Sequence, residues 1–423
     1  MIHNFKKSVE QLEKAKKVIP LGTQTFSKCY TQFSVGASPL FIERAKGSHA
    51  WDVDGNEYID WPFGLCSIVL GHSMDDINDE VKVQMDKGSL FSLPNSLEAE
   101  VSEMLCELIP CAEMVRFGKN GSDATAGAVR AARAITGKDM VACCGYHGWQ
   151  DWYIGTTVRN LGVPESTKEI TKTFKYNDLE SLRSLLEGNP GKFAAIIMEP
   201  IGVEYPQPGF LEGVRKLANE HSALLIFDEI ITGFRMNLGG AQKEFNVIPD
   251  LACFGKAMAN GYPISAVVGP KKFMKIFEEI FFSFTFGGEL LSLAATKAVI
   301  NFMKKNNVIE NLKVKGQKLM DGVNSLIKKH KLEKNLFIKG YPARNVLIFK
   351  DEDGNEDLLA KTFFVEQCAI RGILFGSAHN MSYSITEDDI LKTLNAYDEI
   401  MKLIKKGSLT INGTMLLPVF RKA

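Results

Sequence analysis

The sequence lacks an excess of charge of either sign. Its 423 residues contain 50 Lys and Arg against 50 Asp and Glu, so the formal net charge is zero. Proteins that bind nucleic acid or an anionic membrane surface through electrostatics usually carry a basic patch or tail. We therefore expect neither nucleic acid nor a membrane as a partner.

Long apolar runs are missing too. The sequence contains no stretch of about 18 apolar residues, the length that a membrane-spanning helix needs. The N-terminal stretch MIHNFKKSVEQLEKAKK carries charges where a secretory signal needs an apolar segment. These features predict a cytoplasmic protein.

The cysteines lack the spacings that bind metal or form a disulfide framework. The chain has eight of them, with no CxxC pair and no histidines at a matching distance. A zinc site or a set of structural disulfides requires such patterns. We expect reduced, mostly structural thiols and no metal.

Two short patterns mark an N-terminal segment, residues 1–75. Apolar residues at spacings of three and four predict an amphipathic helix over residues 5–18. The stretch WDVDGNEYIDW, residues 51–61, has β-prone segments on both sides of Asp54-Gly55, a common hairpin turn. We expect a helix and a β-meander that belong to the smaller domain.

Residues 76–305 contain short, continuous apolar runs separated by stretches with helical spacing. The runs cover residues 140–144, 194–198, 223–227 and 265–268. Strands that are apolar on consecutive residues are typical of a parallel sheet covered by helices on both faces. This region is predicted to be a large α/β domain.

Residues 306–423 are predicted to form a smaller α+β domain. They begin with a Lys-rich helical stretch and continue with NVLIFKDEDGNE, an apolar segment that ends at an Asp-Gly turn. A last helix is predicted over residues 387–406, with Thr386 as its N-cap.

Two residues carry the chemistry of the predicted large domain. The apolar segment LLIFDE places Asp228 at the carboxyl end of a buried strand, the edge at which open α/β sheets bind ligands. It could pair with a protonated heterocycle nitrogen or merely cap a turn. Lys256 follows Gly255 and has no acidic neighbour in sequence, which favours a desolvated, nucleophilic amine. A solvent-exposed surface lysine is the alternative.

Two further segments could hold a flat, phosphorylated ligand. In KNGSDATAG a Gly-Ser pair, Gly121 and Ser122, opens a helix that is predicted to run from about Ala124 to Thr136, and helix N-termini bind phosphate. Capping alone would also explain this pair. No Gly-Lys pair is followed by Ser or Thr, so a Walker motif is absent. In CGYHGW, Tyr146 and His147 follow an apolar run, where an aromatic ring can stack on a cofactor or join the core.

Together these parts are the ones needed to hold pyridoxal phosphate, or PLP. The sequence resembles the class III aminotransferases of PLP fold type I, and within them the branch of glutamate-1-semialdehyde 2,1-aminomutase and its relatives associated with surface polysaccharides. The resemblance spans almost the whole chain. Its motifs are IPLGTQTFSK, WDVDGNEYIDW, NGSDA, YHG, YNDL, PGFLEGVR, LLIFDEIITGFR, GGAQ, PDLACFGK, FTFGGE and AHNMSYSITEDDI.

The resemblance implies an aspartate aminotransferase-like fold with a mostly parallel central sheet in the large domain. It implies that Lys256 forms a Schiff base with PLP and that Asp228 pairs with the pyridinium nitrogen. Tyr146 would stack on one ring face and count with these two as catalytic. The other implied cofactor contacts are Asn120, Gly121, Ser122, His147, Ile230 and Thr285.

Thr285 would reach the phosphate of a neighbouring subunit, so the resemblance implies a homodimer with shared active sites. Arg235 is also matched, and we assign it to the scaffold. The implied reaction moves an amino group between an amino donor and an aldehyde or ketone, with a sugar-derived compound among the candidates.

The chain departs from the aminomutase at Lys28, Glu204 and Glu289. The aminomutase has an arginine, a small Gly-rich loop and an asparagine in the matching places, so these three residues are candidate substrate contacts. The alternatives for function are the aminomutase itself, another PLP reaction such as racemisation or decarboxylation, and a noncatalytic binding protein of the same fold. For Lys28, Glu204 and Glu289 the alternative is an ordinary charged residue of the surface or of a loop.

Overall fold

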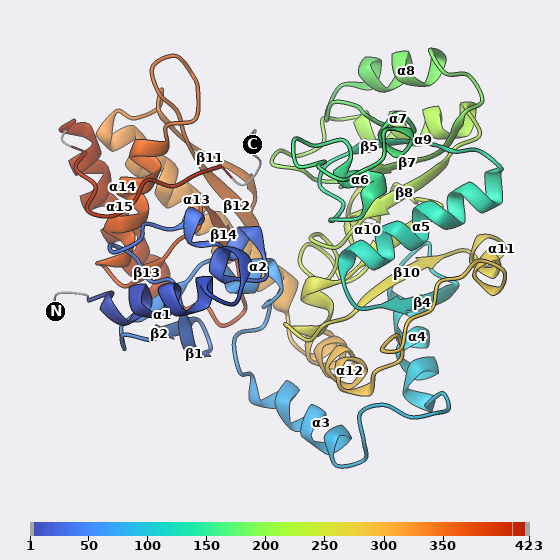
Figure 1. Ribbon diagram of the computed structural model, residues 1–423, viewed down its shortest axis with the longest axis horizontal. Helices are drawn as coiled ribbons and strands as arrows, with labels where there is room; N and C mark the ends of the chain where they lie inside the picture. The colour runs from blue at the N-terminus through green and yellow to red at the C-terminus, as the bar shows by residue number, and fades with distance from the viewer. Residues whose placement is uncertain (1–3, 408, 419–423) are drawn as a thin grey trace. The chain divides into compact units, whose positions relative to one another are not determined.

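The computed structural model describes residues 4–407 and 409–418 and divides them into two compact units. Unit 1 combines the described residues up to Met74 with those from Glu310 onward. Unit 2 contains Asp75–Ile309. Both are shown in Figure 1, where chain order is given by colour.

Unit 2 is built on a seven-stranded sheet with the strand order β4-β10-β9-β8-β7-β5-β6. The strands are β4 (Met114–Gly118), β5 (Met140–Cys144), β6 (Thr171–Thr173), β7 (Phe193–Met198), β8 (Leu224–Asp228), β9 (Leu251–Phe254) and β10 (Ser265–Gly269). The five strands from β9 to β6 are parallel. Strand β10 runs antiparallel to both of its neighbours, β4 and β9.

The four predicted apolar runs all form strands, namely β5, β7, β8 and β10. Every residue of these four strands is buried, as a sheet covered on both faces requires. The run at 265–268 was expected in a parallel sheet, but β10 is antiparallel to both neighbours. Burial on both faces predicts a strand and does not determine its direction. Strands β4, β6 and β9 are too short or too polar to stand out in the sequence.

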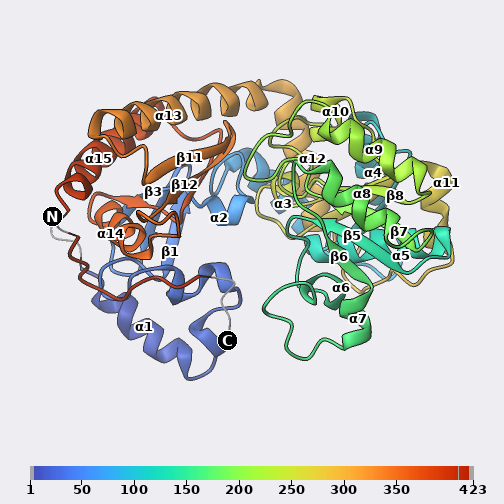
Figure 2. The ribbon, with the colours of Figure 1, turned by 90° about the horizontal axis from the view of Figure 1, so that it is seen from above.

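Helices cover the sheet. In unit 2 they are α3 (Asp75–Met85), α4 (Ser96–Leu108), α5 (Gly121–Thr136), α6 (Asp151–Ile154), α7 (Glu165–Glu169), α8 (Leu179–Glu187), α9 (Phe210–Glu220), α10 (Ala241–Phe245), α11 (Lys271–Met274) and α12 (Leu290–Lys305). Helix α5 packs on one face, and α9 lies on the other, where it contacts β8 (Figure 2).

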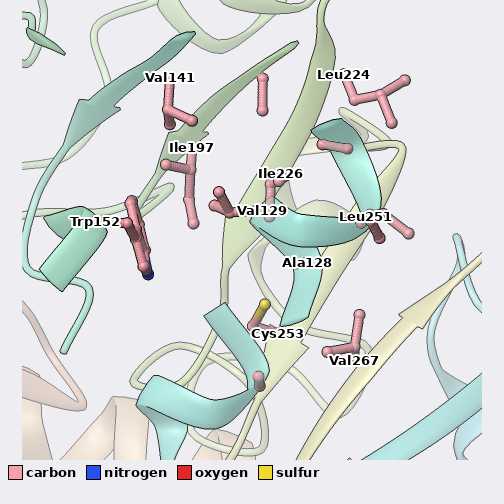
Figure 3. Packing of buried hydrophobic residues seen from close by; sticks show 14 of the residues in the cluster. Ala128, Val129, Val141, Trp152, Ile197, Leu224, Ile226, Leu251, Cys253 and Val267 are labelled. Carbon is pink, nitrogen blue, oxygen red and sulfur yellow. The ribbon is translucent and has the colours of Figure 1, made fainter. Parts of the chain in front are cut away.

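The core of unit 2 lies between α5 and the sheet. Ala128 and Val129 of α5 pack with Ile197 and Ile226 of the central strands (Figure 3). The many small residues of α5 let the helix approach the strands closely. Its C-cap Gly137 has a left-handed φ of 66°, as the sequence predicts for the end of this helix.

Unit 1 contains two small sheets. The first has the order β1-β2-β3-β13 and the second β11-β12-β14. The strands are β1 (Ile42–Lys46), β2 (His49–Asp52), β3 (Glu57–Asp60), β11 (Leu336–Tyr341), β12 (Arg344–Phe349), β13 (Ile373–Leu374) and β14 (Ala378–Asn380). Because β13 pairs with β3, a strand from the second half of the chain completes the N-terminal meander.

The helices of unit 1 are α1 (Lys6–Lys16), α2 (Phe63–Cys66), α13 (Val308–His330), α14 (Leu358–Ala369) and α15 (Glu387–Lys405). Helix α13 begins two residues before the boundary of the unit. The predicted hairpin forms between β2 and β3, and Thr386 caps α15 through a hydrogen bond from the N–H of Asp389. Among the described residues, no helix has the length and apolar character needed to cross a membrane.

Candidate active site

The predicted site residues of unit 2 follow the carboxyl ends of adjacent parallel strands. Tyr146 and His147 come after β5, Asp228 ends β8, and Lys256 comes two residues after β9. These strands are neighbours in the order β9-β8-β7-β5. Parallel strands end at the same edge of the sheet, so residues far apart in sequence share one ligand-binding edge.

Asp228 is held by two hydrogen bonds in a buried position. Its Oδ2 lies 2.8 Å from Nδ1 of His147, and its Oδ1 accepts the N–H of Ile230 at 3.2 Å. The exposed fractions are 3% for Asp228 and 1% for His147. A buried carboxylate must be paired in this way to keep its charge. The His147 ring also stacks on Trp152, with 6.0 Å between ring centroids.

Glu199 is a second acid at this edge, one that the sequence motifs did not single out. It follows β7 directly, and its Oε2 accepts the N–H of Tyr146 at 3.0 Å. A Cβ on Gly145 would come within 2.5 Å of the same oxygen, so glycine is required there. Burial, and next to it the charge of Asp228, raises the pKa of Glu199. Its signal in the sequence, an acid directly after the apolar run AAIIM, matches that of Asp228.

The start of α5 faces the same region. Asp123 accepts the N–H groups of Lys119 and Asn120, at 3.1 and 2.7 Å. The N–H groups of Gly121 and Ser122 lie in the first helical turn, where no intrahelical acceptor exists. These two amides and the positive end of the helix dipole are therefore suited to bind a phosphate group.

Ile230 connects the helix start with the loop of Lys256. A Cβ on Gly121 would lie 2.6 Å from its Cδ1, and a Cβ on Gly255 would lie 3.8 Å from its Cγ2. Lys256 itself is partly buried and has a left-handed φ of 42°, which is unusual for a residue with a side chain. Backbone strain of this kind is common at functional sites.

Tyr146 presents an aromatic ring at the surface of this site. Its side chain is 51% exposed, and its ring meets that of Tyr153 edge to face, with centroids 5.6 Å apart. An aromatic ring that is half exposed at such an edge is a candidate for stacking on a flat ligand.

The remaining predicted residues lie elsewhere. Thr285 is exposed in the loop before α12, and Glu204 is exposed in the loop after β7. Lys28 lies in unit 1, at the end of a short 3₁₀ turn (Phe26–Lys28). Arg235 is fully buried in unit 2.

Glu289 has a local structural environment of its own. Its carboxylate caps α12 by accepting the N–H groups of Leu291 at 2.7 Å and Ser292 at 3.2 Å. Its Oε2 also lies 2.9 Å from Nζ of Lys119. The carboxylate is thus engaged within unit 2, and a contact of Glu289 with substrate stays a prediction.

Comparison with known proteins identifies the family of the chain. The sequence profile described as aminotransferase class-III matches residues 30–406. The chain belongs to the class-III aminotransferase family. This confirms the family predicted from the sequence, an enzyme of the transaminase class, and PLP as the cofactor of that family.

Three similar proteins represent the class-III aminotransferases and their solved structures. The 3-aminobutyryl-CoA aminotransferase of Cloacimonas acidaminovorans is 38% identical over 410 residues, which cover 95% of this chain and 98% of that protein. The glutamate-1-semialdehyde 2,1-aminomutase of Roseiflexus castenholzii is 38% identical over 327 residues, 73% of this chain and 75% of that protein.

The solved structure is the PLP internal aldimine form of the FumI protein of Sphingopyxis sp. MTA144. It has a TM-score of 0.89 and 28% identity, and the match covers 96% of this chain and 98% of that one. This similarity and the mostly parallel sheet of unit 2 confirm the predicted fold class.

Proposed function

We propose that this enzyme moves an amino group from an amino donor to an aldehyde or ketone acceptor, and that Lys256 is its essential amine. The observation that carries the proposal is the convergence of Lys256, the buried Asp228–His147 pair and the start of α5 at one sheet edge. An amine, a buried acid and a phosphate site are the three elements that PLP requires of its protein.

The residues of unit 2 fit this cofactor. Gly121 has no side chain, which lets Ile230 pack closely against the start of α5, where the phosphate would bind. Nε2 of His147 is buried and has no hydrogen-bond partner among the described residues, so the hydrogen bond between Nδ1 and Asp228 and the stacking on Trp152 align the ring. Bound PLP supplies an aldehyde that takes up amino groups and a ring that draws electrons from the substrate carbon.

Each side chain at this sheet edge has a separate role. Asp228 would hold a proton on the ring nitrogen by offering a buried negative charge, and His147 orients Asp228. Tyr146 would cover one face of the ring and Ile230 the other. The amides of Gly121 and Ser122 would hold the phosphate beside Asn120. Nζ of Lys256 takes the proton from the substrate carbon, acting as a general base.

The site is proposed to be completed by a second copy of the chain, with Thr285 reaching the neighbour's phosphate. The loop that carries Thr285 supports this, because Phe281 and Phe286 beside it are 80% and 58% exposed. Large apolar groups gathered at a surface are typical of an interface. Cytoplasmic localisation also stays a prediction.

The relatives suggest the substrate class. A protein named 3-aminobutyryl-CoA aminotransferase matches nearly the whole chain, which supports a β-amino acyl compound as the first candidate donor. A sugar-derived carbonyl compound is the second candidate. Isomerisation of glutamate 1-semialdehyde is the alternative reaction, supported by the aminomutase relative at equal identity.

Half-reactions followed through the absorbance of the bound cofactor test the function. β-Amino acids, their thioesters and α-amino acids serve as donors, followed by keto acids and sugar aldehydes as acceptors. We expect donors to bleach the cofactor band and acceptors to restore it.

Lys256→Ala should retain cofactor noncovalently but lose multiple turnover by at least a hundredfold, since it lacks the base. Turnover of Lys256→Ala at the wild-type rate would contradict the assignment, and efficient isomerisation without an external donor would favour the aminomutase.

A further inference from the structure

Ser265 of unit 2 has a buried hydroxyl without a protein partner. It is the first residue of β10, its exposed fraction is 0%, and its Oγ makes no hydrogen bond with any residue that the structure describes. An unpaired hydroxyl in the interior costs free energy, and buried polar side chains nearly always have a partner. An acceptor on a bound ligand would satisfy this hydroxyl.

The hydroxyl of Ser265 lies beside the start of α5. Side chains alternate along a strand, so Ser265 is on the same face of the sheet as Val267, which packs with Ala128 of α5 (Figure 3). In the register of the sheet it is paired with Gly118, in the segment that leads from β4 into α5. A Cβ on Gly118 would lie 2.7 Å from Oγ of Ser265 and 3.1 Å from Cβ of Asp123. Because Asp123 belongs to the first turn of α5, the hydroxyl is close to the helix start.

Ser265 also borders the loop that carries Lys256. A Cβ on Gly255 would lie 3.7 Å from Cβ of Ser265 and 3.8 Å from Cγ2 of Ile230. Ile230 reaches the helix start as well, since a Cβ on Gly121 would lie 2.6 Å from its Cδ1. The serine therefore lies where the start of α5 and the loop of Lys256 come together, within unit 2.

Hydrogen-bond donors predominate at this helix start. The N–H groups of Gly121 and Ser122 have no intrahelical acceptor, and the helix dipole adds positive charge. The acid of the first turn, Asp123, is engaged by the N–H groups of Lys119 and Asn120. A phosphate group offers several acceptor oxygens, so it can bind a side-chain donor in addition to the two amides.

We propose that Ser265 is a further cofactor contact, whose hydroxyl donates a hydrogen bond to a phosphate oxygen at the start of α5. This deepens the proposed function, on which it rests, because it adds a side-chain donor from β10 to the backbone donors of the helix. A phosphate held from the helix and from the strand is fixed relative to the neighbouring loop of Lys256. Ser265 acts by positioning the cofactor and takes no part in proton transfer.

Two ligands that differ only in the phosphate test this contact. The full-length chain is freed of cofactor and titrated with PLP and with pyridoxal, and binding is followed by tryptophan fluorescence. Ser265→Ala removes the hydroxyl and little else. We expect this variant to bind PLP at least tenfold more weakly than wild type, because hydrogen bonds to a charged acceptor are the stronger ones. Its affinity for pyridoxal should be unchanged.

Thermal unfolding of the cofactor-free chain separates a ligand contact from a structural role. Without ligand, Ser265→Ala should unfold at the same temperature as wild type or a higher one, because it loses an unpaired buried hydroxyl. Inorganic phosphate should then raise the unfolding temperature of wild type more than that of the variant.

Ser382→Ala is the matched control in unit 1. Its hydroxyl is equally buried but already donates to the carbonyl of Val69 at 3.2 Å. This variant should unfold at a lower temperature than wild type, and its affinities for PLP and pyridoxal should both be unchanged.

Three results would overturn the proposal. If Ser265→Ala weakens PLP and pyridoxal equally, the serine only packs against the cofactor. If it weakens neither, the hydroxyl has no contact with the phosphate. If the ligand-free variant is less stable than wild type, the hydroxyl already serves the fold.

These results are separable from a failure of the proposed function. A wild-type enzyme whose cofactor responds to amino donors, but whose PLP affinity is the same in Ser265→Ala, contradicts the serine contact alone. A wild-type chain that binds inorganic phosphate more tightly than Ser265→Ala but takes up no PLP contradicts the function and leaves the serine as a phosphate contact.

Discussion

His379 illustrates how a buried polar residue shapes unit 1. It is fully buried, its Nδ1 lies 2.8 Å from Oδ1 of Asn345, and its Nε2 lies 2.8 Å from the hydroxyl of Tyr397. The rings of Trp61 and His379 lie nearly perpendicular to each other, with centroids 5.1 Å apart. Burial lowers the pKa of His379 from 6.5 to about 3, because a charged imidazolium would lose its hydration there.

Acid should therefore destabilise the protein through this histidine. Between pH 6.5 and about 3 the unfolded chain binds a proton that the folded chain excludes, so stability falls as pH drops. The slope from this group is about 1.4 kcal/mol per pH unit. Urea unfolding at pH 7, 6 and 5 measures it. His379→Gln, which can keep both hydrogen bonds, should flatten the slope, whereas His221→Gln in unit 2 should not. An unchanged slope in His379→Gln would contradict the assignment.

At the same scale, the sequence indicated some site residues and not others. Asp228 was singled out because it follows an apolar strand, and Lys256 because it follows a glycine and has no acidic neighbour in sequence. The structure places both at the same edge of the sheet, and their roles stay predictions. Glu199 carries the same signal but no motif drew attention to it. The engagement of Glu289 by Lys119 was not predictable, since the two residues are 170 positions apart.

At the scale of elements, the ion pair of Lys119 and Glu289 connects the start of α5 with the start of α12. The side chains are only 16% and 17% exposed. Burial alone would raise the pKa of Glu289, but hydrogen bonds from Ser292 and Lys119 bring it below its ordinary value. A carboxylate with a lowered pKa stabilises the fold above its unfolded pKa, and this contribution is lost as the pH falls through the folded value.

Removing this carboxylate should loosen both helix starts. Glu289→Ala deletes the N-cap of α12 and the ion pair, and it should cost about 1 to 2 kcal/mol of stability. Glu289→Asn keeps a good capping residue and should cost less. Thermal unfolding of the holoenzyme compares the stabilities of the two Glu289 variants. Lys119→Met and the double variant Glu289→Ala/Lys119→Met complete a double-mutant cycle. If the stability losses of the two single variants add up to the loss of the double variant, Lys119 and Glu289 have no coupling free energy and the expected ion-pair contribution is wrong.

The elements themselves were largely predictable where periodicity or burial was strong. Helices α5 and α15 and the hairpin of β2 and β3 agree with their patterns to within a few residues. The helix predicted over residues 5–18 is shorter in the structure, where it spans Lys6–Lys16, because Lys17 and Val18 form a turn before Pro20. Strand β6 has only three residues, and such a strand is defined by its neighbour rather than by its own sequence.

At the scale of the whole molecule, strand order and direction were beyond the sequence patterns. Apolar runs identified which segments are buried, but the position of β10 between β4 and β9 depends on pairings that only the folded sheet decides. The same holds for β13, which joins β3 across more than 300 residues of sequence. Family resemblance supplied the fold class where periodicity alone could not.

Assembly is the last property of the whole molecule that the sequence only implies. The loop before α12 exposes Phe281, Phe284 and Phe286 by 80%, 38% and 58% around Thr285. Arg130 and Arg116 donate to the carbonyls of Phe281 and Phe282, so the loop is held in this exposed form. Apolar surface held outward is stabilised when a second copy covers it.

We therefore expect a homodimer in solution, and sedimentation equilibrium should give twice the mass of the chain. Phe281→Glu combined with Phe286→Glu should weaken the dimer and reduce amino transfer at least about tenfold, because the partner's Thr285 leaves the site. Leu391→Glu places the same charge on an exposed leucine of α15 and should change neither mass nor rate. If the double variant remains dimeric and active, the loop does not form the interface. If it becomes monomeric yet keeps full activity, each chain carries a complete site and Thr285 plays no part across subunits.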